Sequence, residues 1–445
     1  MKKFFMLTII LLFSLCLLTY NFYNDSSIDD TSINNIKPQN MLSIMLENSE
    51  GSGNYEMSTL NSWPTDGYVF NSELSKCENG GTLSWDNNTK KVEFSGNNID
   101  NCYVYFDVDA SMSLAEYVIS QYTGTQGVNG IYYHDANLTN GAGDNSYRFA
   151  GANPNNYVCF GSDDATCPSE NLYRIIGVID GKIKLISADG APTTMLGTDE
   201  GYIKTYQAAF GSDSSYYKGN GDLTKIGTYK WNKSGTNTWS SSTTNTTNLN
   251  TNYLTYLDSK NTKWKTMIDD TTWYVGGMTR DNGRDSNAKT AYNYEVGANK
   301  DGTTVNEKIG LMYVSDYGFA AAPSAWTTIL YNYDDAAIKN ENWLYIGLCE
   351  LTISRRSDDS NLAFAVRDAG DLGGGAVDSS YGSAARPTFN LSSSIKFTSG
   401  EGTAVNPIRI KLWIHFINYV FYEIWLLTNE LVVFFFCVII ILVEV

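Results

Sequence analysis

The stretch LYRIIGVIDGKIKLI (172–186) places two apolar runs on either side of the dipeptide Asp180-Gly181. Asp-Gly is favoured in two-residue type I′ turns, because both central positions of that turn need a positive φ angle. The stretch therefore predicts an antiparallel β-hairpin. We assign this hairpin to the largest domain of the chain, for which we expect the bounds 140–410.

Shorter patterns predict the other elements of this domain. They are helices at 250–260 and 262–270, strands at 271–277 and 361–370, a strand followed by a turn at 307–322, and strands that close the sheet at 385–391 and 394–400. Short helices between irregular strands, joined by long polar loops, favour an α+β fold over a doubly wound parallel sheet.

A smaller β-module is expected upstream of this domain. Residues 41–110 alternate short strands with turn residues, and the polar segment DNNTKK (86–91) between two alternating runs predicts a hairpin. The next segment, 111–139, is expected to supply a helix and a connector, because Ser113 and Glu116 have the spacing of a capping box. We expect this helix to pack on the domain that follows.

Charge and histidine content exclude some classes of function. The 445 residues carry a formal net charge of −17, and no basic stripe compensates it, which argues against a nucleic-acid partner. The sequence has two histidines, His134 and His415, so a histidine-rich metal site is excluded. A histidine-based catalytic triad would need one of the two. We expect His134 to be an exposed loop residue.

Four of the seven cysteines form two closely spaced pairs, Cys77 with Cys102 and Cys159 with Cys167. Each pair is expected to form a disulfide in an oxidising compartment. Zinc is the competing interpretation, but no C-x-x-C or histidine spacing supports it. Cys16 and Cys437 lie in hydrophobic terminal segments. Cys349 is left over, and a lone cysteine is more often a small buried apolar residue than a nucleophile.

Both ends of the chain are hydrophobic. Residues 1–23 carry two lysines followed by an apolar run, which indicates export, either with a cleaved signal peptide or with an uncleaved membrane anchor. The positive-inside rule places the bulk of an anchored chain outside the membrane. A polar linker is expected at 24–40. The tail 411–445 has three interpretations: a second membrane-associated segment, a buried hairpin, or translation past the natural end of the gene.

Several stretches resemble an uncharacterised family of exported proteins from low-GC gut bacteria. They are 156–186, 308–328, 342–370 and 385–407, and the stretch 49–86 is similar to the module that often precedes that domain. The family has no established activity. The resemblance, which covers most of 47–410, implies a C-type-lectin-like domain, and the sulfatase-modifying-factor branch of that fold is the nearest comparison.

The chain departs from these relatives in ways that bear on chemistry. Ala385 stands where valine is expected before Arg386-Pro387, and NPIRI (406–410) replaces an ending like D-P-Y-R-I. Sulfatase-modifying enzymes use a pair of cysteines, whereas Cys349 has no neighbouring cysteine. Their iron-dependent cousins need a histidine-rich site that this chain lacks. Arg386, inside a strand pattern, is expected to be a structural ion-pair partner rather than a ligand contact.

The stretch CELTISRRSDDSNLAFAVRDAGDLGGGAVDSSYGSAARP (349–387) is expected to form strand, loop and strand. One interpretation of its charged loop is a solvated turn with local ion pairs, which are worth little. The other is a recognition face, because arginine and aromatic residues carry much of the binding energy at interfaces. The candidate ligand-binding residues are Trp343, Tyr345, Arg355, Arg356, Asp358, Asn361 and Asp368.

The sequence as a whole favours a non-catalytic surface protein. We expect it at the cell membrane with its bulk outside, binding an unknown glycan or protein through the lectin-like domain. A carbohydrate-active enzyme on the same fold and a purely structural envelope protein are the alternatives. Calcium is the one cofactor retained, because the loops 281–289 and 162–167 are rich in oxygen ligands.

Overall fold

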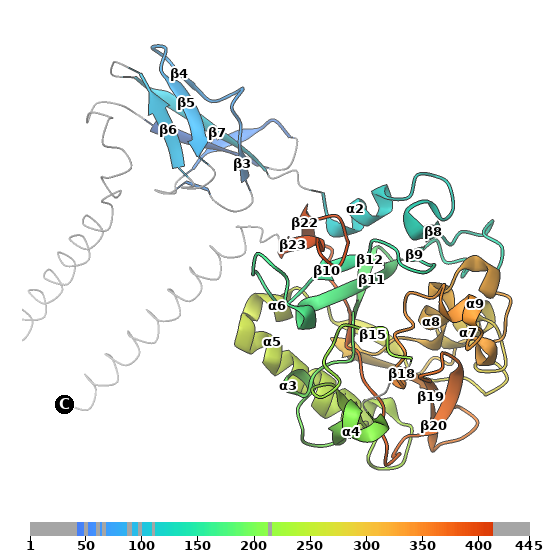
Figure 1. Cartoon of the computed structure of the whole chain (residues 1–445). Coiled ribbons are helices and arrows are strands. Elements are labelled where there is room, and N and C mark those ends of the chain that lie inside the picture. Colours follow the sequence, from blue (N-terminus) through green and yellow to red (C-terminus); the bar gives the residue numbers. More distant parts are fainter. Residues whose placement is uncertain are drawn as a thin grey trace, which may run out of the picture. The chain divides into compact units, whose positions relative to one another are not determined.

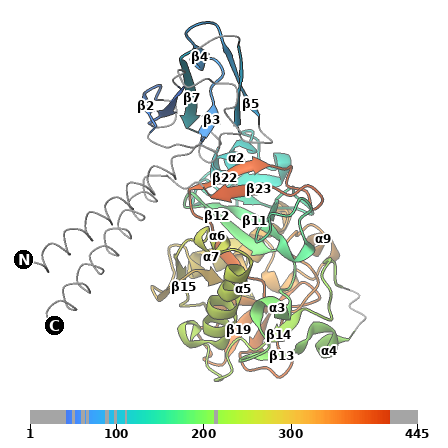
Figure 2. The same cartoon turned by 90° about the vertical axis from the view of Figure 1, so that its left-hand side faces the viewer.

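The computed structural model describes residues 42–48, 52–58, 63–64, 68–86, 91–96, 100–108, 112–211 and 216–412 (Figures 1 and 2). The chain divides into two compact units, Met1–Ser111 with Ile414–Val445 and Met112–Trp413. Its regular structure is mixed α/β and mostly sheet. The expected signal or anchor segment, the linker and the tail from 413 onward lie outside the described residues. Among the helices of the described residues, none is long and apolar enough to cross a membrane.

The smaller unit contains a five-stranded sheet and a separate hairpin. The sheet strands are β1 (Leu42–Glu47), β2 (Tyr55–Met57), β3 (Tyr68–Phe70), β4 (Lys76–Cys77) and β7 (Cys102–Val108), and the hairpin strands are β5 (Thr82–Asp86) and β6 (Lys91–Ser95). Alternate residues of β7 are buried, as expected for a strand with one face on a core. Trp85 lies opposite Val92, which confirms the hairpin predicted around DNNTKK.

The larger unit is organised around a seven-stranded antiparallel sheet. Its strands are β8 (Ile131–Tyr133), β9 (Tyr147–Phe149), β10 (Tyr157–Cys159), β11 (Leu172–Ile179), β12 (Lys182–Ser187), β17 (Ile309–Gly310) and β21 (Thr388–Asn390). The hairpin β11–β12 is as predicted: Ile179 lies opposite Lys182, and Asp180 and Gly181 have φ angles of 50° and 73°. Both arms are almost fully buried, so this hairpin supplies the centre of the core.

Smaller sheets surround the central one. They are β13 (Tyr202–Thr205) with β14 (Gly227–Tyr229), β15 (Thr271–Tyr274) with β16 (Thr304–Glu307), β18 (Glu350–Arg355) with β19 (Leu362–Val366) and β20 (Leu372–Ala376), and β22 (Ile395–Ser399) with β23 (Arg409–Leu412). The strand within 385–391 does close the central sheet, as β21 beside β12. The strand within 394–400 does not, because β22 pairs with β23 in a ribbon of its own.

Short helices pack around these sheets. They are α2 (Leu114–Ser120), α3 (Thr193–Leu196), α4 (Tyr206–Phe210), α5 (Leu254–Lys260), α6 (Thr262–Thr266), α7 (Ala288–Glu295), α8 (Val314–Ala320) and α9 (Ala336–Lys339), with a π-helix, η4 (Thr244–Tyr253), before α5. Helix α2 has the predicted capping box between Ser113 and Glu116. It packs against β11 and β22 of its own unit, as expected, and both views show it beside β22 (Figures 1 and 2).

The turn predicted after the strand in 307–322 is wrong. Residues Val314–Ala320 form helix α8, and all seven are buried. The first backbone N–H groups of this helix are accepted by the carboxylate of Glu295, which lies at the end of α7. Asp316 adds a local cap by accepting the backbone N–H of Tyr313, but the Glu295 cap comes from another helix and leaves no local sequence signal.

Candidate binding cleft

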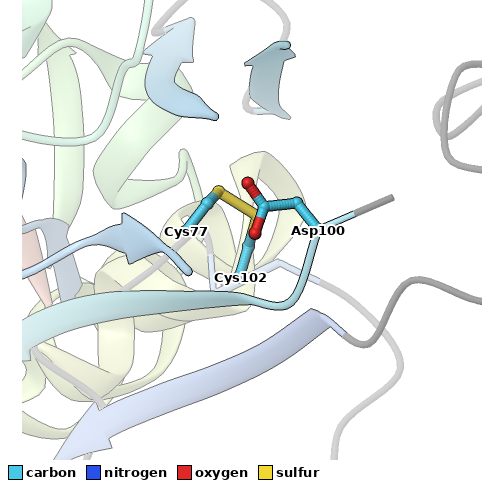
Figure 3. Close-up of side chains that lie close together, drawn as sticks. All are labelled: Cys77, Asp100 and Cys102. Carbon is cyan, nitrogen blue, oxygen red and sulfur yellow. A yellow bond between two sulfur atoms is a disulfide. The ribbon is translucent and has the colours of Figure 1, made fainter. Parts of the chain in front are cut away.

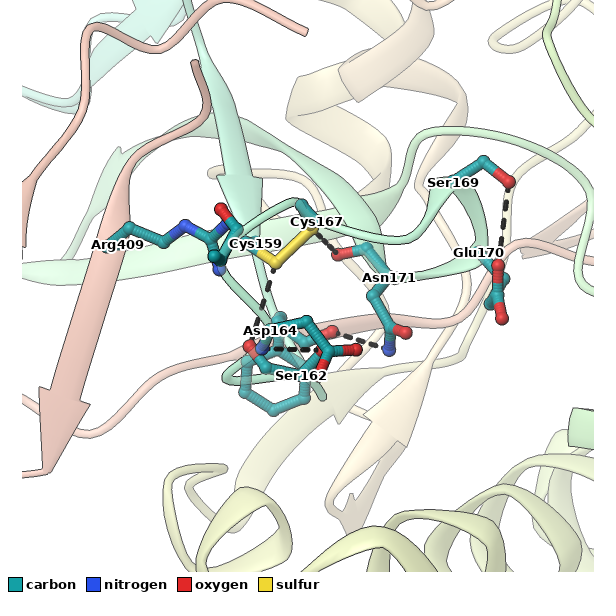
Figure 4. The surroundings of a disulfide bond; sticks show 10 residues. Cys159, Ser162, Asp164, Cys167, Ser169, Glu170, Asn171 and Arg409 are labelled. Atoms are coloured by element: carbon teal, nitrogen blue, oxygen red, sulfur yellow. Dashed lines mark hydrogen bonds between the residues drawn. A yellow bond between two sulfur atoms is a disulfide. The ribbon is translucent and has the colours of Figure 1, made fainter. Parts of the chain in front are cut away.

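The two predicted disulfides both form, and each closes a local loop. Cys77 is bonded to Cys102 across β4 and β7, and Cys159 to Cys167 (Figures 3 and 4). Asp100 lies within metal-ligand reach of the first pair. Its carboxylate accepts hydrogen bonds from the backbone N–H groups of Asn79 and Gly81, at 2.7 and 2.9 Å. Because both sulfur atoms form a disulfide, no thiolate is available to bind a metal. This cluster is therefore a disulfide-linked turn rather than a thiolate metal centre.

The two loops considered for calcium already hold ion pairs. In the disulfide loop, Asp163 pairs with Lys263, and Arg409 donates a hydrogen bond to the carbonyl of Ala165 at 2.8 Å (Figure 4). In the loop 281–289, Arg280 pairs with Asp285 at 2.9 Å. A cation at either carboxylate would have to displace a basic side chain. Neither loop is therefore the strongest candidate site.

The larger unit contains a polar cleft with a volume of about 520 Å³. We call it the polar cleft, and its lining comes from 144–148, 179–184, 270–274, 292–300, 313–316 and Asn390. These residues belong to strands β9, β11, β12, β15 and β21, to helices α7 and α8, and to the turns beside them. The volume lies within the range typical of pockets for small organic ligands.

Three buried charges form the floor of the polar cleft. The Lys184 ammonium lies 2.5 Å from one carboxylate oxygen of Asp316, and Arg148 lies 3.5 Å from the other. Arg148 also pairs with Asp144 at 2.8 Å. The side chains of Arg148, Lys184 and Asp316 are 4, 6 and 2% exposed. Burial lowers the pKa of Lys184 even though Asp316 lies beside it. These groups are fixed in place before any ligand arrives.

Aromatic rings form part of the wall of the cleft. Lys184 lies 4.6 Å from the ring centre of Tyr313 and 5.6 Å from that of Trp273, within cation–π distance. Lys300 lies 4.9 Å from the ring centre of Tyr274. Four basic and four acidic side chains line the cleft: Arg148, Lys182, Lys184 and Lys300, with Asp144, Asp180, Asp270 and Asp316. The lining charges therefore balance, which favours a neutral or zwitterionic polar ligand over a polyanion.

Glu295 stabilises the cleft without lining it. Its carboxylate accepts the backbone N–H groups of Val314 and Ser315 at 2.9 and 2.8 Å, and the hydroxyl of Ser354 also donates to it. Burial raises the pKa of Glu295 to about 7 in spite of these donors. This group does not line the cleft, so its role is to hold the start of α8, and with it Asp316, in position.

We expect Glu295→Gln to change the pH dependence of stability. The pKa of Glu295 rises from 4.5 to about 7 on folding, so the native state holds the proton more tightly than the unfolded state. Its contribution to stability is full below pH 4.5 and is lost as the pH rises through 7. Between pH 5 and 8 the wild type should lose about 2.5 kcal/mol of unfolding free energy relative to the variant. Urea unfolding at both pH values measures this, and parallel pH profiles would contradict it.

The residues proposed from sequence fall into two groups, and none of them lines the polar cleft. Trp343 and Tyr345 are buried in the loop before β18, and the Tyr345 hydroxyl donates to the carbonyl of Asp368 at 2.7 Å. Four others, Arg355, Arg356, Asp358 and Asn361, lie in or beside the β18–β19 turn, and Asp368 lies between β19 and β20.

The β18–β19 turn is held by contacts within the protein. Arg356 makes a two-point contact with Asp358 at 2.6 and 2.8 Å, which lowers the pKa of Asp358 to about 2. Arg355 donates to the carbonyl of Val275 at 3.1 Å. The side-chain amide of Asn237 donates to three carbonyl groups of the turn, including that of Arg356 at 2.7 Å. Asn361 is exposed. The geometry is that of an internally paired turn.

The expectation that His134 is exposed is wrong. Its side chain is 0% exposed and lies against the rings of Phe319 and Trp326. Its Nδ1 accepts the backbone N–H of Ala142 at 3.0 Å. Burial, together with the charge of Arg148, lowers the pKa of His134 to about 3. The imidazole is therefore neutral at physiological pH. The polar neighbours of His134 in the sequence suggested a loop, but aromatic residues about 190 positions away enclose it.

Two charged residues within apolar segments of the sequence could have indicated the polar cleft. Lys184 interrupts the apolar arm of the central hairpin, and Asp316 lies within an apolar segment. Charged residues at inward positions are almost never buried unless paired. Their partners come from distant segments, so the pairing itself could not be predicted.

No family model, curated protein or solved structure matches the chain. The resemblance drawn from sequence therefore stays an expectation, and function has to be inferred from the residues of this chain.

Proposed function

We propose that this chain is an exported surface-binding protein whose polar cleft takes a short segment of a neutral carbohydrate. The observation that carries the proposal is one cleft that combines balanced lining charges, three of them almost fully buried, with aromatic rings. Sugars present hydroxyl groups that can both donate and accept hydrogen bonds. Fixed carboxylate, ammonium and guanidinium groups meet both needs. The two disulfides suit an extracytoplasmic compartment.

Ring faces support the carbohydrate class in particular. A pyranose ring carries an apolar C–H face beside its hydroxyl groups, and aromatic side chains offer flat apolar surface with little loss of conformational freedom. Tyr274 and Tyr292 are only partly buried and line the cleft, so their rings are available to pack on such a face. We also propose a lectin-like fold and a membrane tether at the N-terminus, and both of these depend on the sequence expectations.

A binding role is favoured over glycoside hydrolysis by the state of the carboxylates. Hydrolysis of this kind needs a carboxylic acid that is protonated and faces the scissile bond. Burial would raise the pKa of Asp144, but Arg148 and Ser146 outweigh it and hold the pKa at about 2. Asp316 is held by two basic groups. Glu295 has a raised pKa but does not line the cleft.

A glycan array probed with the oxidised full-length chain tests the proposal. We expect Tyr274→Ala to weaken binding about tenfold, because an aromatic contact of this kind is worth about 1 kcal/mol beyond its buried area. Tyr381→Ala is the matched control, since Tyr381 is 62% exposed and does not line the cleft. Its binding should equal that of the wild type.

Two further arms separate the alternatives. An Arg355→Ala/Arg356→Ala double variant should bind as the wild type does; loss of binding there would move the site to the β18–β19 turn. The array is run both in calcium and in EDTA, and loss of binding in EDTA would show that binding depends on calcium. If no glycan binds, the structural envelope role is favoured over binding. Release of a reducing sugar would favour a carbohydrate-active enzyme.

A further inference from the structure

A second pocket, with a volume of about 190 Å³, lies elsewhere in the larger unit and shares no lining residue with the polar cleft. We call it the cationic pocket. Its charged lining residues are Arg174, Lys218, Lys339 and Asp189. Among the described residues, the pocket lining therefore has three cations and one carboxylate, although the net charge of the chain is −17.

Arg174 is the fixed element of the cationic pocket. The residue is 6% exposed, and its guanidinium lies between the rings of Tyr157 and Trp343, at 4.3 and 4.6 Å from their centres. Its donors reach neutral acceptors only: Asn156 Oδ1 at 2.7 Å, the carbonyls of Pro154 and Trp343 at 3.1 and 3.3 Å, and Asn153 Oδ1 at 3.4 Å. Among the described residues, no carboxylate lies within ion-pair distance of it. Burial lowers its pKa to about 10.

Two lysines add charge at the same pocket. Lys218 donates to Asn340 Oδ1 at 2.7 Å and lies 4.9 Å from the ring centre of Tyr345. Lys339 donates to the carbonyl of Ala369 at 3.2 Å. Neither has a carboxylate partner within the part of the chain that the structure describes. Burial and then the charge of Lys339 lower the pKa of Lys218, so the two ammonium groups repel each other.

Among the described residues that line the pocket, Asp189 is the one carboxylate, and it does not neutralise these cations. Asp189 accepts hydrogen bonds from the Tyr217 hydroxyl at 2.5 Å and from the backbone N–H groups of Gly221 and Gly190 at 2.7 and 2.8 Å. All three donors are uncharged. A buried cation without a counter-charge is costly, and folded proteins usually pair it or neutralise it. A ligand that brings the missing negative charge removes that cost.

We propose that the cationic pocket binds the anionic group of a small ligand, a carboxylate, sulfate or phosphate, with Arg174, Lys218 and Lys339 supplying the counter-charge. Guanidinium and ammonium groups are the common partners of such oxyanions in proteins. The rings of Trp343 and Tyr345 line the same pocket and lie next to Arg174 and Lys218, which they hold beside the ligand position. This site is separate from the polar cleft, so it adds a second ligand class to that of the proposed function.

The test measures anion binding to the oxidised full-length chain by calorimetry at constant ionic strength. The probes are glucuronate, inorganic sulfate and inorganic phosphate, with glucose as the neutral comparison. We expect saturable binding of at least one anion, and the preferred probe identifies the group. A Lys218→Gln/Lys339→Gln variant should bind that anion at least tenfold more weakly. It leaves Arg174 in place, so the fold around Asn156 and Pro154 is retained.

The matched control is Lys204→Gln/Lys260→Gln. These lysines also lie over tyrosine rings, those of Tyr381 and Tyr256, and their loss changes the net charge equally. This control and Tyr274→Ala should both bind the anion as the wild type does. The anion result is therefore independent of whether the polar cleft binds carbohydrate. Equal weakening in both lysine variants would reveal non-specific attraction and overturn the proposal, as would no saturable binding of any anion.

Discussion

Asp316→Ala should lower the free energy of unfolding by about 3–5 kcal/mol, because it leaves the buried charges of Lys184 and Arg148 without their shared partner. Asp316 also accepts the backbone N–H of Tyr313 at 2.8 Å, so the substitution removes a cap of α8 as well. Urea unfolding followed by tryptophan fluorescence measures the change. The effect should be large because each group involved is almost fully buried, and solvent cannot replace the lost carboxylate.

The matched control for this prediction is Asp270→Ala. Asp270 lines the same cleft, but its side chain is 67% exposed and lies 3.6 Å from Lys308. An exposed pair of this kind is worth about 0–1 kcal/mol. Adding Lys184→Met to Asp316→Ala should recover part of the loss, since it removes one unpaired cation. Equal costs for Asp316→Ala and Asp270→Ala would show that the floor of the cleft is not held by charge.

The elements that the sequence predicted well are those with local signals. The turn at Asp180-Gly181 and the capping box of Ser113 and Glu116 each depend on residues within three positions of one another, and both are present. Helix α8 has a local cap, Asp316, which the prediction overlooked, and a distant cap, Glu295, which lies about 20 positions upstream and could not be predicted. Local contacts made an element predictable where the residue pattern was also clear, and contacts from distant segments could not be predicted.

The polar cleft shows the same limit for function. Arg148 and Asp316 are 168 positions apart, and the register of the central sheet places Arg148 of β9 and Lys184 of β12 on either side of Gly177. Arg355 and Arg356 of the β18–β19 turn were predicted to bind a ligand because charged and aromatic residues lie close together in this part of the sequence. Trp343 and Tyr345 are close to them in sequence, yet they line the cationic pocket instead. Clustering along the chain was a poor guide to clustering in space.

Glu350 and Arg386 provide the second prediction with a large effect. Arg386 was expected to be a structural ion-pair partner, and it donates to Glu350 at 2.6 Å with both side chains 2% exposed, which confirms that expectation. Glu350→Ala should lower the free energy of unfolding by about 3–5 kcal/mol, because Arg386 keeps its charge but loses its partner. A Glu350→Met/Arg386→Met variant should cost much less, since apolar residues of similar size can replace a buried pair.

A double-mutant cycle at pH 8 measures the coupling between these two residues. Burial raises the pKa of Glu350 to about 7 although Arg386 opposes the shift, so at pH 8 the carboxyl group is mostly ionised. The comparison cycle uses Arg280 and Asp285, which are 2.9 Å apart but 50 and 31% exposed. Coupling there should stay below about 1 kcal/mol, against several kcal/mol for the buried pair. Similar coupling energies in the two cycles would mean that burial does not strengthen the interaction, and Arg386 would then contribute by packing rather than by charge.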